Sequence, residues 1–214
     1  MTDATLPGPM LRALRSLCET IEQENKALSE LDGAIGDGDH GVNMAKCFRE
    51  VRKKLSECEG LDFGGLFRQV GMVVMNSVGG AMGALYGTFF LRLAQSSSGK
   101  TRLNLDDWVQ MLRAAEKGIL EIGKARAGDK TLLDTLMPAV RALENAQSKG
   151  KPLPEALQDF RAAAEQGMLS TRNMIARAGR ASRLGERTLG HQDAGATSCY
   201  FILHALAQSA QTGA

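Results

Sequence analysis

Three aspartates stand close together in a run that is rich in glycine. Asp32, Asp37 and Asp39 fall within the segment LDGAIGDGDHGVNM. Carboxylates this close repel one another, and the intervening glycines let the backbone fold tightly enough to bring them together. A divalent cation would turn that repulsion into binding. We predict a site for Mg²⁺, because this ion accepts a few carboxylates and completes its shell with water and phosphate oxygens.

A polar turn is the alternative to a metal site. In that interpretation Asp39 only caps a helix that begins near Val42, and the other two carboxylates are solvated. An EF-hand is excluded, because the position eleven residues after Asp37 holds Phe48 instead of the Glu that such a loop requires.

Two polar residues follow the aspartates where a helix is expected to begin. His40 and Asn43 would lie among free backbone N–H groups at the positive end of the helix dipole, which favours a phosphate. A histidine in such a place is more often a partly exposed turn residue than a ligand, so its assignment depends on its neighbours. A nucleotide phosphate is the ligand that fits both the helix end and the metal.

Basic residues elsewhere in the chain offer further contacts to phosphate. A basic stretch is either a solvated helix end or a source of guanidinium groups that neutralise phosphate charge. Its members are Arg177, Arg180, Arg183 and Arg187. Lys130 could also reach a phosphate, although a lysine near a turn is usually solvated.

The segment AQSSSGKT resembles a phosphate-binding P-loop in its last residues. Ala94 stands where the first glycine of that motif belongs. The segment also ends an apolar helical stretch, whereas a P-loop follows a strand and opens a helix. We therefore expect a flexible turn here.

Helices must position these loops, because apolar residues recur at spacings of three and four and no convincing period-two strand is found. About eight helices are expected, roughly over 11–28, 42–58, 63–78, 84–95, 108–122, 136–143, 157–168 and 196–206. Asp106 and Thr131 are the predicted N-caps of two of them, and Pro154 is the predicted first residue of another. Short connections between long helices force antiparallel neighbours, so the predicted fold is an all-α, up-and-down bundle.

Glycine gathers in four interruptions of the helical pattern, at 33–41, 79–83, 123–128 and 179–195. Helices that alternate in direction bring every second connection to the same end of a bundle. Several of these loops should therefore converge on one site.

Bulk properties narrow the class of protein. The 214 residues carry a formal net charge of +2, which argues against a nucleic-acid or membrane-surface binder. No tract of distinct composition divides the chain, so we expect one domain over 1–214. The four cysteines form no CxxC pair and are expected to be buried and reduced. With neither a secretory leader nor a membrane-spanning run, the protein is expected in the cytoplasm.

Four sequence blocks resemble a known family. LDGAIGDGDHGVNM, VGGAMGALYGTFFL, GKARAGDKTLLDTLMPA and GRASRLGERTLGHQDAGATS are similar, in order and spacing, to the signature blocks of the L subunit of dihydroxyacetone kinases (DhaL). The resemblance covers nearly the whole chain. It implies an eight-helix antiparallel barrel with ADP or ATP at one end and a deep apolar interior.

The same resemblance implies roles for individual residues. Asp32, Asp37 and Asp39 would bind two Mg²⁺ ions that bridge the nucleotide phosphates, and Arg180 would be catalytic. The implied nucleotide contacts are His40, Gly41, Val42, Asn43, Ala81, Met82, Gly123, Leu132, Arg180, Asp193, Ala194 and Gly195. The chain departs from the commoner family pattern at three of its residues, which are Met82, Ala84 and Ala194. A methionine has no hydroxyl group, so backbone N–H groups of the turn would have to contact phosphate there.

The resemblance also implies partners. The acceptor would be dihydroxyacetone held covalently on a histidine of a K subunit. The phosphate would come from exchanging ATP, or from a phosphotransferase-system M subunit that rephosphorylates bound ADP. A transcriptional regulator is a further implied partner, and a homodimer or hetero-oligomer is expected. The alternatives are a kinase subunit for another small keto-sugar such as a tetrose, a relative of the nucleotide domain of fatty acid kinases, and a regulatory module that senses nucleotide state.

Overall fold

The computed structural model describes residues 4–210, and this part of the chain is helical. Its α-helices are α1 (Pro7–Gln23), α2 (Asn25–Ile35), α3 (His40–Leu55), α4 (Phe63–Ser77), α5 (Gly80–Ser96), α6 (Leu105–Ile122), α7 (Leu133–Ser148), α8 (Leu153–Ser170) and α9 (Ala194–Gln208). Two 3-10 helices, η1 (Thr171–Asn173) and η2 (Arg180–Thr188), lie between α8 and α9. The described residues contain no strand, only an isolated bridge between Thr5 and Leu103. The predicted all-α class is confirmed.

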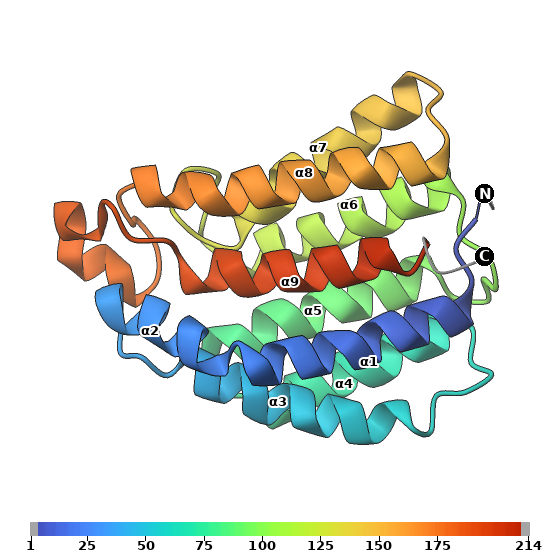
Figure 1. Ribbon diagram of the computed structural model, residues 1–214, viewed down its shortest axis with the longest axis horizontal. Coiled ribbons are helices and arrows are strands. Elements are labelled where there is room, and N and C mark those ends of the chain that lie inside the picture. Colours follow the sequence, from blue (N-terminus) through green and yellow to red (C-terminus); the bar gives the residue numbers. More distant parts are fainter. Residues whose placement is uncertain (1–3, 211–214) are drawn as a thin grey trace.

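The first predicted helix is two helices, which raises the number of α-helices in the described chain from eight to nine. α1 and α2 meet at Glu24, whose N–H still donates to the carbonyl of Thr20 and whose carbonyl accepts from Leu28. The break is therefore small, and α2 continues the direction of α1 (Figure 1). Helical structure extends to Ile35, so Asp32 belongs to a helix and not to the loop in which we expected it.

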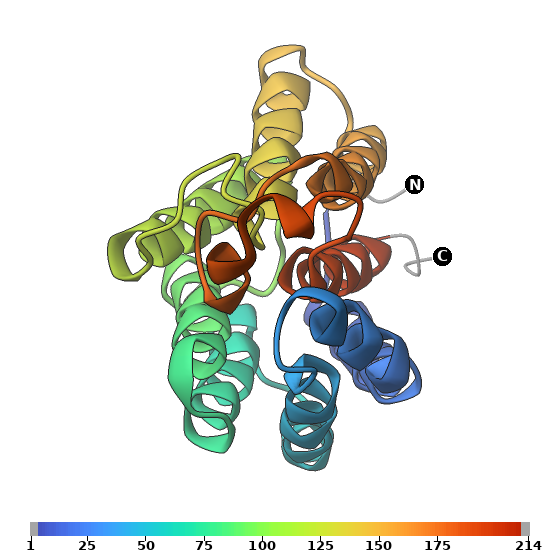
Figure 2. The ribbon, with the colours of Figure 1, turned by 90° about the vertical axis from the view of Figure 1, so that its left-hand side faces the viewer.

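The helices form a closed antiparallel ring. From α3 onward each helix packs on the next along the chain, and α9 packs on α1, which itself packs on α3 (Figures 1 and 2). α9 also contacts α7 and α2, so it lies partly inside the ring. Its sequence suits that position, because helix α9 buries apolar residues on nearly every side. The up-and-down barrel implied by the sequence is confirmed.

A continuous apolar core fills the ring. Large side chains such as Phe48, Phe90 and Trp108 are fully buried, and the indole N–H of Trp108 donates to the hydroxyl of Thr5 at 3.0 Å. The four cysteines are buried and free, as predicted. Along the described chain, no helix combines the length and the apolar character that crossing a membrane requires.

Two of the predicted helix starts need correction. Asn104 caps α6, because its side chain accepts the N–H of Asp107 and the Asp107 carboxylate accepts the N–H of Asn104. Asp106 is instead the second residue of that helix. Thr131 does accept the N–H of Leu133 through its hydroxyl, at 3.2 Å, although the residue that directly precedes α7 is Leu132.

The alternation of direction brings four connections to one end of the barrel, which we call the site end. These connections are 36–39, 78–79, 123–132 and 171–193. The site end lies at the left of Figure 1 and faces the viewer in Figure 2. The chain enters and leaves the barrel at the opposite end (Figure 1). All four glycine-dense interruptions therefore lie at one end of the barrel, where the pattern predicted that several of them would meet. Pro154 is the second residue of α8, one position later than expected.

Candidate metal and nucleotide site

Three carboxylates meet where α2 turns into α3. Each of Asp32, Asp37 and Asp39 offers an oxygen that lies within 4.8 Å of those of the other two. Asp32 Oδ2 accepts hydrogen bonds from the backbone N–H groups of Asp39 at 2.9 Å and of His40 at 3.3 Å. The aspartate in α2 therefore fixes the start of α3 close to the end of α2. Gly38 has φ of 77°, a conformation that favours glycine. The predicted convergence of the three acidic side chains is thus present.

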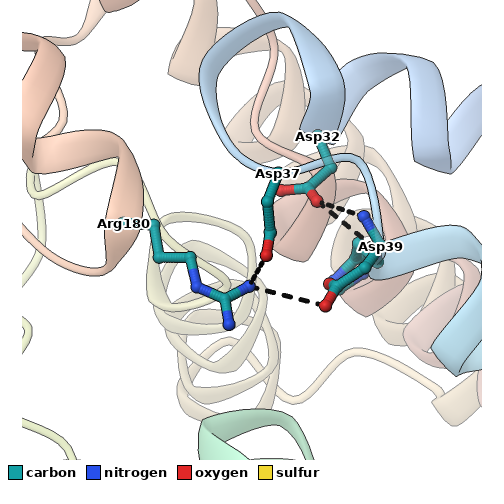
Figure 3. Close-up of polar contacts among 5 residues, drawn as sticks. Asp32, Asp37, Asp39 and Arg180 are labelled. Atoms are coloured by element: carbon teal, nitrogen blue, oxygen red, sulfur yellow. Dashed lines mark hydrogen bonds and ion pairs between the residues drawn. The ribbon is translucent and has the colours of Figure 1, made fainter.

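A guanidinium faces this carboxylate cluster. Arg180, the first residue of η2, contacts Asp37 Oδ2 and lies 3.5 Å from Asp39 Oδ2 (Figure 3). The two segments are about 140 residues apart in the chain, and only closure of the ring brings them together. Because Asp37 and Asp39 are both exposed, their oxygens remain accessible to a cation from solvent. Three carboxylates, two of them exposed, whose ion-pair partner among the described residues is Arg180, have the donor chemistry that Mg²⁺ prefers.

The polar-turn alternative is wrong in its detail. Asp39 does precede the first residue of α3, but its side chain makes no capping hydrogen bond. The first N–H groups of the helix instead point toward Asp32. The carboxylate of Asp39 therefore makes no hydrogen bond to the backbone of α3.

His40 is half-buried, and it is the first residue of α3 rather than the partly exposed turn residue of the alternative interpretation. Its Nε2 lies 2.8 Å from Ser198 Oγ, which in turn lies 2.7 Å from the Tyr86 hydroxyl. Tyr86 donates to the carbonyl of Gly195 at 3.0 Å. Burial lowers the pKa of His40, and the nearby carboxylates of Asp32 and Asp39 oppose that shift. Neither Tyr86 nor Ser198 was predicted from the sequence, because no local pattern marks them.

Gly41 is required by the crossing of α2 and α3. A Cβ atom at this position would overlap the carbonyl oxygen of Asn25 and would lie 2.7 Å from the backbone nitrogen of Ser29. Any side chain would push α3 away from α2 and would spread the carboxylates between them. Val42 and Asn43 follow in the first turn, where Val42 is exposed and the Asn43 N–H donates to the Asp39 carbonyl.

We predict that Gly41→Ala destabilises the protein by about 2 kcal/mol, since overpacking against backbone typically costs 1–3 kcal/mol. Urea unfolding followed by circular dichroism measures this change. Gly8→Ala is the matched control, because a Cβ at that helical glycine would meet only the far end of Arg12, at 3.8 Å. Equal unfolding midpoints for the two variants would contradict the packing argument.

The remaining predicted residues lie at the site end but differ in their contacts. Asp193 caps α9 by accepting the Ala196 N–H at 2.7 Å, and burial raises the pKa of Asp193 to about 6. Ala194 and Leu132 are buried nearby, whereas Gly195 supplies the carbonyl that Tyr86 contacts.

Three predicted residues stand apart from the network around the carboxylates. Ala81 and Met82 belong to the first turn of α5, and Gly123 is the residue that directly follows α6. Within residues 4–210 the hydrogen bonds of the carboxylate cluster reach His40 and Arg180 but not these three. Met82 packs partly against the apolar core.

The P-loop-like segment lies at the opposite end of the barrel, where α5 ends. The N–H of Gly99 donates to the Asp62 carboxylate at 2.6 Å, and Lys100 forms an ion pair with Asp107 at 2.8 Å. Its donors are thus engaged within the protein. The rejection of a P-loop agrees with this placement.

Taken together, the fold and the site define an all-α barrel with a carboxylate cluster and an opposing arginine at one end. The DAK2 domain family matches residues 34–208. A relative from Escherichia coli (strain K12), the ADP-binding subunit DhaL of a PEP-dependent dihydroxyacetone kinase, is 43% identical and aligns over 90% of this chain and 92% of its own. A Listeria innocua subunit of the same description is 38% identical over 97% of this chain and 95% of its own.

Solved structures show the same fold. The crystal structure of the dihydroxyacetone kinase of C. freundii superposes with a TM-score of 0.70 at 27% identity, covering 94% of this chain and 34% of that one. The structure of a C. freundii dihydroxyacetone kinase in complex with AMP-PNP and Mg²⁺ gives a TM-score of 0.67 at 25% identity, covering 98% and 35%. This chain thus spans about a third of those kinase chains. It belongs to the DAK2 domain family and, within it, to the L subunits of dihydroxyacetone kinases.

Proposed function

We propose that this chain is the nucleotide-carrying subunit of a dihydroxyacetone kinase, which holds ADP or ATP with Mg²⁺ and passes a phosphoryl group to dihydroxyacetone on a K subunit. The observation that carries the proposal is the meeting of Asp32, Asp37 and Asp39 within 4.8 Å, opposite Arg180. The names of the relatives as ADP-binding subunits and the AMP-PNP and Mg²⁺ complex of a similar structure support it.

In this proposal the three aspartates hold two Mg²⁺ ions. The donor set fits, because its oxygens are close together and two of the side chains are exposed. Bound Mg²⁺ would neutralise phosphate charge and orient the phosphates for transfer. Asp32 fixes the turn through its two backbone hydrogen bonds, so the other two carboxylates are held in place without side-chain partners inside α3.

We assign Arg180 the catalytic role. A planar guanidinium suits the charge that spreads over the phosphoryl oxygens during transfer, and this one is already oriented toward the metal-binding carboxylates. Phosphoryl transfer needs little covalent chemistry from the protein, so positioning and charge cancellation are sufficient.

The proposed nucleotide contacts lie within the four connections of the site end or in the helix turns that directly follow them. They are His40, Gly41, Val42, Asn43, Ala81, Met82, Gly123, Leu132, Arg180, Asp193, Ala194 and Gly195. Since the His40 ring is engaged with Ser198 and its N–H with Asp32, we assign the phosphate contact at the α3 N-terminus to the backbone N–H groups of the residues that follow it. We propose one domain over 1–214, which the continuous apolar core of the described residues 4–210 supports.

The phosphate source follows from the relatives as a proposal. Those from E. coli and L. innocua are named PEP-dependent and one from Lactococcus lactis is named PTS-dependent, which favours ADP that an M subunit of the phosphotransferase system rephosphorylates in place. The same names favour dihydroxyacetone over a tetrose as acceptor. Location in the cytoplasm, a homodimer or hetero-oligomer and contact with a transcriptional regulator stay predictions.

One experiment tests the function directly. The purified chain is denatured, the released nucleotide is identified by chromatography, and the native chain is then incubated with phosphoenolpyruvate and phosphotransferase proteins. We expect retained ADP that is converted to ATP, and loss of that ADP when the protein is first dialysed against EDTA. A chain that neither retains nor binds ADP or ATP in the presence of Mg²⁺ would refute the proposal.

A further inference from the structure

Lys130 is a buried lysine in the 123–132 connection, and its side chain is neither solvated nor directed to a phosphate site. The residue is 2% exposed. Its ammonium donates to four backbone carbonyls, those of Thr171 at 2.7 Å, Met174 at 3.2 Å, Thr188 at 2.7 Å and His191 at 2.5 Å. An ammonium has three protons, so all of them are engaged by this set. Both interpretations that the sequence suggested for Lys130 are therefore wrong.

The four carbonyls come from the two ends of a single segment. Two belong to 171–174 and two to 188–191, so Lys130 joins the start and the finish of the long connection between α8 and α9. We call these two ends, 171–174 and 188–191, the neck of the loop. A backbone hydrogen bond also joins them, since the Gly190 N–H donates to the Arg172 carbonyl at 2.8 Å. The residues between these ends form a closed loop, and Arg180 lies within it.

The backbone around Lys130 is arranged to deliver the ammonium. Lys130 has φ of 62°, and it is the only residue other than glycine with positive φ in the described chain. That conformation is unfavourable for a residue with a side chain, so the surroundings must enforce it. Asp134 does so by accepting the N–H groups of Gly128 at 2.5 Å and Thr131 at 2.8 Å, on both sides of Lys130.

Burying a lysine charge is expensive, which argues that this position has a specific duty. Desolvation lowers the pKa of Lys130, and the nearby carboxylate of Asp193 partly offsets the effect. An apolar residue would avoid the desolvation but would leave four carbonyls at the neck without a donor. Because one ammonium donates hydrogen bonds to carbonyls at both ends of the loop, it fixes the position of the loop relative to the 123–132 connection.

We infer that Lys130 is a positioning residue for Arg180: by clamping the neck of the 171–191 segment it fixes the guanidinium opposite Asp37 and Asp39. The inference rests on the proposed function for the role of Arg180. Among the described residues, Arg180 makes the loop's only hydrogen bonds to the carboxylates. Beyond the neck the loop is a 3-10 segment kinked at Gly185, whose other attachments are packing against α2 and the hydrogen bond from the Arg177 N–H to the Asp129 carbonyl. Without the clamp the loop keeps its length but loses its defined distance from the metal-binding turn.

The first test is a double-mutant cycle on phosphoryl transfer. We expect Lys130→Met to slow single-turnover transfer roughly 10-fold, as misplacement of a catalytic group does, while Mg²⁺-dependent ADP affinity changes little. In an Arg180→Ala background the same change should alter the rate by less than about twofold, because the group it positions is absent. Lys124→Met, an exposed lysine of the same connection, is the matched control. An equal slowing in both backgrounds, or none in either, overturns the inference.

A second test needs no transfer activity and so separates this inference from the proposed function. Arg177, Arg183 and Arg187 are exposed, and trypsin cleaves at such sites only as fast as the loop opens. We expect cleavage within the loop to be roughly 10-fold faster in Lys130→Met than in the wild type, and unchanged in Lys124→Met. If the methionine variant fails to fold, Lys130→Gln, which keeps two donors, carries the same tests and should give intermediate values. Cleavage of the folded variant at the wild-type rate overturns the inference.

Discussion

Replacing Asp37 with asparagine is expected to weaken Mg²⁺-dependent ADP binding at least about 100-fold while leaving the helix content unchanged. The loss of a direct ligand should exceed the 10–100-fold that changes around a metal site typically cost. Folding should be little affected, because the Asp37 side chain is 46% exposed and its partner Arg180 is exposed as well. Isothermal titration with ADP in the presence of Mg²⁺ measures the affinity, and circular dichroism measures the helix content.

Asp159→Asn provides a matched control for this prediction. Asp159 is also an aspartate in an ion pair, with Lys151 at 2.5 Å, and its side chain is 43% exposed, but it lies in the first half of α8, toward the opposite end of the barrel. The Asp159→Asn variant should bind ADP with the affinity of the wild type. Wild-type affinity in the Asp37 variant would remove that residue from the metal site and would leave only two carboxylates to hold two ions.

Removing the guanidinium of Arg180 is expected to affect phosphoryl transfer far more than ADP binding. Arg180→Ala should slow single-turnover phosphoryl transfer to the K subunit by about 100- to 1,000-fold, the usual effect of deleting one group that stabilises developing charge. Arg180→Lys should recover part of the loss, since an ammonium restores the charge without the planar fork. Because the guanidinium contacts Asp37 and Asp39 in this structure, ADP affinity should stay within a few-fold of the wild type or improve slightly.

The control for the arginine series is Arg113→Ala. Arg113 forms an exposed ion pair with Glu144 at 3.0 Å between α6 and α7 and should be replaceable without loss of rate. A transfer rate in Arg180→Ala that equals the rate in this control would mean that Arg180 serves only to balance the charge of the carboxylates.

The features that sequence predicts well here are those fixed by local periodicity. Apolar spacing locates the helices, and their alternating direction places the glycine-dense connections at one end. The break at Glu24 escaped prediction because the apolar face continues across it, so the pattern has no interruption to detect. The capping residue of α6 was misplaced for a similar reason, since Asn104 and Asp106 are both good caps and only the reciprocal bond with Asp107 distinguishes them.

The contacts that define the site are long-range and were harder to foresee. His40 and Ser198 are 158 residues apart, and the four carbonyls around Lys130 are 41 to 61 residues from it. Such pairs depend on how the ring closes, and neither hydrophobic spacing nor residue type encodes that closure locally. The acidic residues are the exception, because three carboxylates within one short turn reveal their proximity in the sequence itself.

Helix α1 begins and helix α9 ends at the end of the barrel opposite the carboxylates (Figure 1). This placement limits which attached domains could reach the carboxylates. α9 has 15 residues, so its length is about 22 Å at 1.5 Å per residue. The linker to a domain or tag joined after α9 must therefore span at least that distance, or about seven extended residues, before the domain reaches the site end. A tag on a linker shorter than this should leave the site end accessible. A covalently attached acceptor domain could dock at the site end only through a longer linker.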